Sequence, residues 1–261
     1  MSRPTRSDYL AALEIVPWVA REEAGDSPAA GAGDATPQAS PAPPVAEPAG
    51  RAEAGSGESG KRGGRAADAV LDWEPLAERV SGCTRCALCQ SRTQTVFGTG
   101  NRQAQLMIVG EAPGAEEDRR GEPFVGRAGK LLDQMLQAIG SSRQQAYIAN
   151  ILKCRPPNNR DPAAEEVSAC QSYLQRQIAL VRPRVLLAVG RIAAQNLLQV
   201  ATPLGRMRGS VQQYAHPEGM VIPVIVTYHP AYLLRSPLQK RAAWDDLKQV
   251  LQVLEPPETT A

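Results

Sequence analysis

The sequence predicts an α/β fold in which helices cover both faces of a mostly parallel sheet. Four short apolar runs alternate with longer segments whose apolar residues recur at helical spacing. This alternation favours parallel strands, because each helix returns the chain to the same end of the sheet. The runs are apolar at nearly every position, as expected of strands buried on both faces.

The apolar runs define the predicted strands, and the segments between and after them define the predicted helices. Strands are expected at 106–110, 146–150, 185–190 and 221–227. Helices are expected at 126–140, 163–181, 191–199 and 238–254. Ligands of such folds bind beyond the carboxyl ends of the strands. We therefore expect the loops that follow three of these strands to meet at one rim, at 110–114, 150–157 and 228–235.

The composition of the 261 residues excludes several classes of protein. With 29 Lys and Arg against 27 Asp and Glu, the chain is neither a histone-like basic protein nor an acidic one. It has no apolar run of about 18 residues, so no membrane span is expected. The N-terminus also lacks the apolar region and cleavage site of a signal peptide. We therefore expect a protein of the cytosol.

The segment 24–68 differs in composition from the rest of the chain. Of its 45 residues, 28 are Ala, Gly or Pro, and Val45 is its single bulky aliphatic residue. Such a segment cannot bury enough apolar surface to offset the entropy lost on ordering, so we predict a disordered linker. The linker separates a short N-terminal peptide, 1–23, from one folded domain, 70–257.

The predicted domain is more basic than the whole chain. Residues 70–257 contain 22 Lys and Arg against 16 Asp and Glu, a net charge of +6, and 18 of the 22 are Arg. Arginine suits bidentate contacts to phosphate, so nucleic acid is a candidate partner. A GC-rich genome would give the same arginine content, and composition alone favours neither explanation.

The five cysteines are too few, and odd in number, for a disulfide scaffold. Cys83 and Cys86 form a C-x2-C pair, and Cys154 and Cys170 offer two more thiols. Four thiolates fit either a structural zinc ion or a [4Fe–4S] cluster. Cys89 extends the first pair to C-x2-C-x2-C, a spacing common in iron–sulfur proteins. Five unrelated buried thiols are the alternative.

Several motifs follow one another in a fixed order. They lie at 83–86, 92–98, 110–114, 117–118, 123–126, 150–157, 159–160 and 229–235. In this order they resemble a family 4 uracil-DNA glycosylase, over about 76–254. The resemblance implies a three-layer α/β/α fold with a central mostly parallel sheet, and removal of uracil from DNA by hydrolysis. It also implies a [4Fe–4S] cluster on Cys83, Cys86, Cys154 and Cys170, with Cys89 outside the ligand set.

The chemistry of uracil recognition requires an aromatic side chain and an amide. Extruding a base from duplex DNA costs a few kcal/mol, and stacking it on an aromatic ring returns about 1–3 kcal/mol. Phe124, in a loop between Pro123 and Gly126, is the candidate ring; a core phenylalanine is the alternative. Asn150 can accept from N3–H of uracil and donate to O4, whereas cytosine presents the opposite pattern.

Breaking the N-glycosidic bond leaves a uracil anion. We expect His229 to stabilise that charge at O2, helped by backbone N–H groups of the loop Ala112, Pro113 and Gly114.

The reaction also needs a positioned water and a means of rejecting thymine. The resemblance places Glu111 and Asn159 near the water. Glu111 could act as a general base or as electrostatic support for the sugar cation, and the sequence does not separate these roles. Glu117 is expected where the methyl group of thymine would have to lie.

Candidate DNA contacts follow the histidine. Leu233 or Leu234 could fill the gap left by the extruded base, with Arg235 on a phosphate. The alternative is the start of a helix that buries both leucines. Arg206 and Arg208 are predicted in a second loop that faces phosphate.

The segment 7–21 carries a short apolar face on a long tether, as docking peptides do. It resembles the N-terminal peptide of the psi subunit of bacterial DNA polymerase III, which binds the chi subunit. The chi subunit is therefore a candidate partner. Packing of the segment on the domain, or no role at all, is the alternative.

The leading hypothesis is a monomeric DNA-repair hydrolase that excises uracil. Its cluster would be structural, because hydrolysis transfers no electrons. The alternatives are a non-catalytic nucleic-acid-binding module that uses the cluster as a scaffold, and a zinc-containing enzyme of another kind.

Overall fold

The computed structural model describes residues 67–255. The N-terminal peptide and nearly all of the predicted linker lie outside this range. Asp68, at the end of the predicted linker, is fully buried, and its carboxylate accepts hydrogen bonds from Arg85 at 2.6 and 2.9 Å. The folded domain therefore includes Asp68.

The core of the domain is a six-stranded sheet with the strand order β1-β3-β2-β4-β6-β5. The four central strands are parallel: β2 Leu106–Gly110, β3 Tyr147–Asn150, β4 Val185–Val189 and β6 Val221–Thr227. Two antiparallel edge strands complete the sheet: β1 Thr99–Gly100 and β5 Gln212–Ala215. The predicted mostly parallel sheet is confirmed, and its four predicted strands are the central ones. The edge strands have no apolar run and were not predicted.

Eight α-helices and three short 3-10 turns are found within residues 67–255. The longer helices are α3 Trp73–Ser81, α5 Arg127–Ala138, α6 Ala164–Val181, α7 Arg191–Leu198 and α10 Lys240–Leu254. The shorter helices are α4 Ala115–Arg120, α8 Leu204–Met207 and α9 Pro230–Arg235. The 3-10 turns are η1 Ala87–Gln90, η2 Pro157–Asn159 and η3 Pro237–Gln239. All four predicted helices are present, and the turn η3 precedes the last of them.

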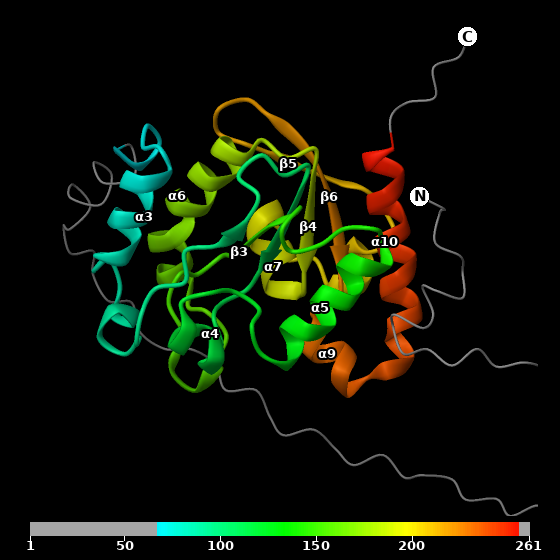
Figure 1. The fold of residues 1–261 in the computed structure, drawn as a ribbon, viewed down its shortest axis with the longest axis horizontal. Coiled ribbons are helices and arrows are strands. Elements are labelled where there is room, and N and C mark those ends of the chain that lie inside the picture. The colour runs from blue at the N-terminus through cyan, green and yellow to red at the C-terminus, as the bar shows by residue number, and fades with distance from the viewer. Residues whose placement is uncertain (1–66, 256–261) are drawn as a thin grey trace, which may run out of the picture.

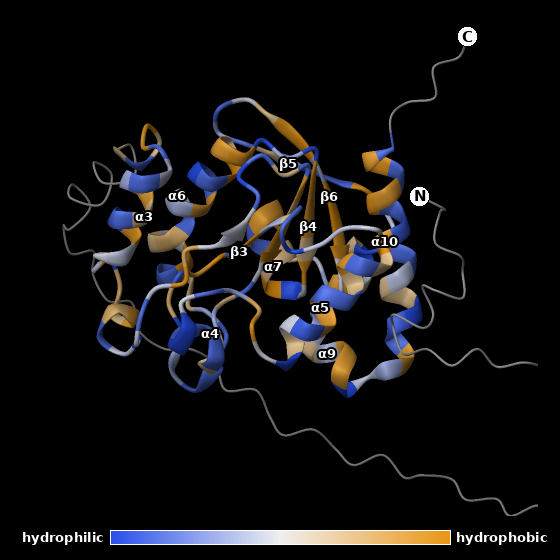
Figure 2. Cartoon of the chain, in the orientation of Figure 1, coloured by the Kyte–Doolittle hydropathy of each residue, from blue (hydrophilic) through white to orange (hydrophobic). Residues whose placement is uncertain are grey.

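Side chains that alternate along the strands divide the core into two clusters. Met107 and Val109 of β2 pack with α6 and α7 on one face, whereas Leu106 and Ile108 pack with α5 and α10 on the other. Burial of each such aliphatic side chain contributes roughly 1.5–3 kcal/mol. In Figure 1, α6 and α10 lie on opposite sides of the sheet. Figure 2 shows apolar strands between helices that carry polar residues outward. The three-layer α/β/α fold is confirmed.

None of the helices within residues 67–255 is long and apolar enough to cross a membrane.

Candidate active site

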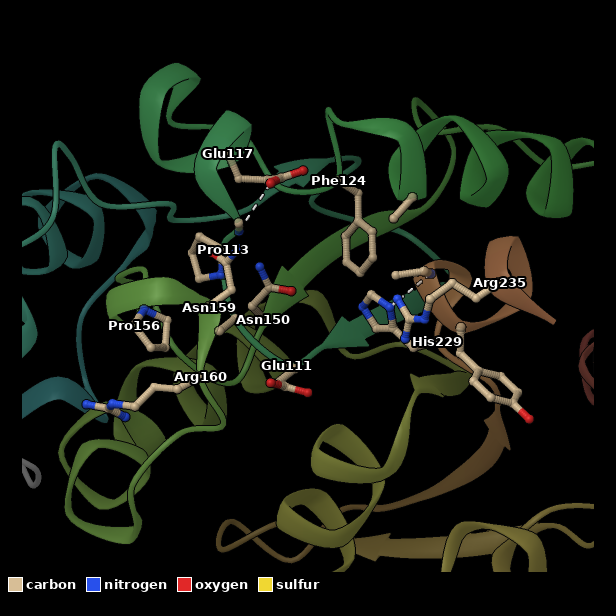
Figure 3. A pocket seen from close by; sticks show the side chains of 15 residues that line it. Glu111, Pro113, Glu117, Phe124, Asn150, Pro156, Asn159, Arg160, His229 and Arg235 are labelled. Atoms are coloured by element: carbon tan, nitrogen blue, oxygen red, sulfur yellow. Dashed lines mark hydrogen bonds between the residues drawn. The ribbon is translucent and has the colours of Figure 1, made fainter.

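A cleft of about 450 Å³ opens beyond the carboxyl ends of β2, β3 and β6. The three loops expected at one rim all contribute to it, as Figure 3 shows. The structure brings together in its lining every residue predicted for catalysis or uracil binding: Glu111, Ala112, Pro113, Gly114, Glu117, Phe124, Asn150, Asn159 and His229. The other lining residues were not predicted individually, although Pro156, Ala231 and Tyr232 lie in the loops expected at this rim: Ala128, Pro156, Arg160, Ala231 and Tyr232.

Gly110, the last residue of β2, allows two functional side chains to approach each other. It pairs with Asn150 of β3 in the parallel register. A Cβ at Gly110 would lie 2.4 Å from Asn150 Oδ1 and 2.6 Å from Phe124 Cζ. Such approaches are too short for any side chain larger than hydrogen, so the glycine is required for this arrangement.

The Asn150 side chain has an unused hydrogen-bonding capacity. The residue is 2% exposed, and Oδ1 has no hydrogen-bond partner within the described part of the chain. Leaving a buried acceptor unpaired costs about 1–3 kcal/mol. A buried amide oxygen that lines a cleft in this state is suited to a ligand that carries an N–H donor.

Phe124 forms a wall of the cleft next to Asn150 and His229. Its ring centroid lies 5.7 Å from that of His229, with an angle of 31° between the rings. The backbone of Phe124 has a φ of +55°, a conformation rare for an aromatic residue. Phe124 lines the cleft and, at 7% exposed, is also a member of the core cluster between the sheet and α5.

His229 is the N-cap of α9, and its Nδ1 accepts a hydrogen bond from the Ala231 N–H at 3.1 Å. In the neutral ring the proton is therefore on Nε2, which leaves Nε2–H as a donor. Burial and then the positive charge of Arg235 lower the pKa of His229 to about 4, against an opposing effect of Glu117. The imidazole is neutral at physiological pH.

Glu111 is the carboxylate at the floor of the cleft in Figure 3. Burial, and secondly the negative charge of Asp161, raise its pKa to about 6, and Arg191 opposes this shift. Asp161 and Arg191 form an ion pair at 2.7 Å. Sequence reasoning missed both residues, since neither belongs to a motif with a chemical signature of its own.

Asn159, the other residue expected near the water, ends the turn η2. Its φ is +53°, a conformation that asparagine tolerates better than most residues. Its Oδ1 accepts a hydrogen bond from Arg155 Nε at 2.8 Å. The amide is thereby held at the edge of the cleft.

Glu117 lines the cleft from α4 and binds backbone of two loops. Oε2 accepts from Gly114 N–H at 3.1 Å, and Oε1 accepts from Val125 and Gly126 N–H at 2.9 and 3.0 Å. Figure 3 shows the first of these bonds. The carboxylate is thus fixed in position.

The structure changes the expectation that either Leu233 or Leu234 could fill the gap left by the extruded base. Leu233 is 1% exposed and belongs to the core cluster between the sheet and α5, whereas Leu234 is 38% exposed. Leu233 is therefore not available to enter DNA in this conformation, and Leu234 is the candidate that remains. Arg235 lines the cleft, and its contact with a phosphate stays a prediction. Leu238, in the turn η3, is 93% exposed and was not predicted.

Arg208 does not face solvent as a phosphate ligand would. Its guanidinium lies 2.7 Å from the Asp246 carboxylate and 4.0 Å from the centroid of the Tyr228 ring. Arg208 thus links α10, through Asp246, to Tyr228, which directly follows β6. This structural role explains its position better than the predicted DNA contact does. Arg206 is exposed at the end of α8.

The four predicted ligand cysteines lie near one another. Burial raises the pKa of the Cys154 thiol, Arg92 opposes this, and Cys86 and Cys83 raise it further. Burial raises the pKa of Cys170 to about 12, with a smaller contribution from Cys154. Arg92 Nη1 donates to Cys154 Sγ at 3.2 Å. Within the described range, no three His, Cys, Asp or Glu side chains are placed to hold one metal ion.

A mostly parallel sheet with a polar cleft beyond the carboxyl ends of its strands defines a ligand-binding α/β protein, and comparison with known proteins narrows this class. Residues 97–248 match the model of the uracil DNA glycosylase superfamily. The type-4 uracil-DNA glycosylase of Archaeoglobus fulgidus is 44% identical over 181 residues, which cover 68% of this chain and 90% of the relative. That of Sulfurisphaera tokodaii is 40% identical, over 71% of this chain and 86% of the relative. The chain belongs to the uracil-DNA glycosylase superfamily, and its type-4 members are among its relatives.

Proposed function

We propose that the protein is a DNA-repair enzyme that flips uracil out of DNA and hydrolyses its N-glycosidic bond. The observation that carries this proposal is the buried, unpartnered Oδ1 of Asn150 in the cleft. Membership of the family and the names of the relatives support it.

Recognition of uracil rests on Asn150 and Phe124. Asn150 Oδ1 accepts from N3–H of the flipped base, and the amide nitrogen donates to O4. Phe124 stacks on the ring and recovers about 1–3 kcal/mol of the cost of unstacking. Cytosine would place an acceptor against Oδ1 and a donor against the amide nitrogen, so both groups would be left unpaired.

The leaving group is stabilised by a neutral histidine. His229 donates from Nε2–H to O2 as negative charge develops there, and the Gly114 loop adds backbone dipoles. Because Nδ1 already accepts from Ala231, the donor is held in its correct tautomer before the substrate binds.

Glu111 and Asn159, which also line the cleft, activate or position the water. Both roles considered for Glu111 require the ionised carboxylate, since a neutral acid neither accepts a proton nor stabilises a sugar cation. Thymine is excluded by Glu117, whose carboxylate cannot move aside without breaking three backbone hydrogen bonds.

A [4Fe–4S] cluster is proposed on Cys83, Cys86, Cys154 and Cys170. The chemistry of the donor set supports it: four thiols from distant segments lie near one another, and Arg92 donates to one of them. A zinc ion would need all four sulfurs around one atom, whereas each thiolate of a cluster binds a different iron. When bound, the cluster would tie the segment before β1 to the segment after β3.

Further contacts to DNA are assigned to Arg235, which lines the cleft, and to Leu234 and Arg206. The chi subunit is proposed as a partner of 7–21, which lies outside the described residues. A monomer in the bacterial cytosol completes the proposal.

The test is incubation of the full-length protein with matched oligonucleotides that contain uracil, cytosine or thymine at one position. Abasic product from the uracil strand alone is expected. No product at high enzyme excess would overturn the proposal and favour the non-catalytic nucleic-acid-binding module.

A further inference from the structure

The loop that carries Phe124 holds this residue in a conformation that costs free energy. Few aromatic residues adopt a φ of +55°, and such backbone persists only where its surroundings enforce it. Gly129, in the first turn of α5, makes room for it, since a Cβ there would lie 1.7 Å from the Phe124 carbonyl oxygen. The loop is therefore held by contacts outside itself.

Arg143 supplies contacts to the carbonyl side of the loop. It lies between α5 and β3, outside every motif of the sequence analysis. Its Nη2 donates to Pro123 O at 2.7 Å, and its Nη1 donates to Phe124 O at 3.2 Å. The guanidinium is itself fixed by ion pairs of 3.1 Å with Glu122 and Asp133, and its side chain is 17% exposed.

Glu117 supplies contacts to the amide side of the same loop. Its Oε1 accepts from the N–H groups of Val125 and Gly126. The Arg143 guanidinium thus binds the carbonyl groups of residues 123 and 124, while the Glu117 carboxylate binds the N–H groups of residues 125 and 126. The peptide groups on both sides of the Phe124 ring are held in place.

We propose that Arg143 is a positioning residue for uracil recognition, which acts through Phe124. With Glu117 it keeps the Phe124 backbone in the left-handed conformation that directs the ring toward Asn150 and His229. The planar fork of arginine is needed because two carbonyl oxygens are bound at once, which a lysine ammonium does not reproduce as well. The inference rests on the proposed function, in which Phe124 stacks on the flipped base.

The test is a double-mutant cycle of Arg143→Ala and Phe124→Ala, with uracil excision measured under single-turnover and steady-state conditions. Arg143→Ala is expected to lower kcat/KM about tenfold and to weaken inhibition by free uracil. In the Phe124→Ala background the same change should have almost no further effect. Arg143→Lys should recover only part of the loss.

Arg184→Ala is the matched control. Arg184 also donates to two backbone carbonyl oxygens, those of Leu254 and Val253 at 3.0 and 3.2 Å, but at the start of β4, the end of the strand away from the cleft. The Arg184→Ala substitution should leave kcat/KM and inhibition by uracil unchanged. Urea unfolding of all variants separates loss of stability from loss of positioning.

Two outcomes would overturn the inference and are distinguishable from each other. If Arg143→Ala lowers kcat/KM by the same factor with and without the Phe124 ring, it does not act through Phe124. An Arg143→Ala variant that does not fold is replaced in the cycle by Arg143→Lys, for which the same criterion holds. If the wild-type protein excises no uracil, the proposed function fails, and the inference fails with it.

Discussion

The Asn150 amide lies directly against Gly110, so that a Cβ on residue 110 would come within 2.4 Å of Oδ1. The two residues end neighbouring parallel strands in register. The position of the Asn150 amide, which we propose reads uracil, is therefore set by the sheet and not by a loop, which favours precise recognition.

Gly110→Ala should disable the enzyme without unfolding it. The added methyl group would displace both Asn150 and the Phe124 ring, the two side chains proposed to bind uracil. We expect kcat/KM to fall by at least about 100-fold, because a misplaced group loses both recognition and alignment. Gly205→Ala is the control, since a Cβ there meets nothing within 4 Å. Near-normal excision by Gly110→Ala would contradict the assignment.

The pH dependence of excision should report the ionisation of Glu111. Since burial raises the pKa of Glu111 to about 6, the active carboxylate is lost as the pH falls through that value. Below it, kcat/KM should fall about tenfold per pH unit. In Glu111→Gln, activity should be lower by about 100-fold or more and this acid limb should vanish. A limb that persists in Glu111→Gln would belong to another group.

His229 should remain neutral under conditions where an ordinary histidine is protonated. Burial lowers its pKa to about 4, so its ring nitrogens should show the neutral tautomer with Nε2–H at about pH 5.5 in NMR spectra. His229→Ala should lower kcat by about 100- to 1,000-fold, as loss of an oxyanion donor does. A cationic ring at about pH 6 would contradict the neutral-donor mechanism.

Asp68 should anchor the start of the domain to the cysteine-bearing segments. Its carboxylate accepts from Arg85, which lies between Cys83 and Cys86, and from Ser172 Oγ at 2.7 Å. Asp68→Ala leaves Arg85 without this partner in a partly buried place and should lower the free energy of unfolding by about 3 kcal/mol. Iron bound per chain should fall as well.

Asp245→Ala is the control for this experiment, as Asp245 forms an exposed ion pair with Lys248 at 2.7 Å. Its loss should change stability by less than about 1 kcal/mol. Equal effects of the two changes in urea unfolding would show that Asp68 is no anchor.

The sequence allowed prediction of the elements that are buried over their whole length. The predicted strands at 106–110 and 185–190 are short, almost entirely apolar runs. Such runs are typical of parallel strands that are covered by helices on both faces. The site residues could also be predicted, because Asn150 and His229 stand in motifs whose chemistry can be argued from residue type.

Contacts between distant segments could not be predicted in this way. Leu233 and Leu234 are adjacent residues of α9. This helix has only six residues, so the spacing of its apolar residues does not reveal which leucine faces the core. Arg143 reaches Phe124 only because the chain folds back between α5 and β3. Asp161 and Arg191 influence Glu111 through space, and no local pattern indicates this.

The proposed reading of uracil by Asn150 is tested most directly by single-turnover excision with the Asn150→Ala variant. Asn196→Ala is the matched control, because Asn196 is a partly buried asparagine of α7 that donates only to its own helix, at Ile192 O. Asn150→Ala should lower excision by at least about 100-fold while its affinity for undamaged DNA and its stability stay close to those of Asn196→Ala. Excision by Asn150→Ala within a few-fold of the control would show that Asn150 does not read uracil.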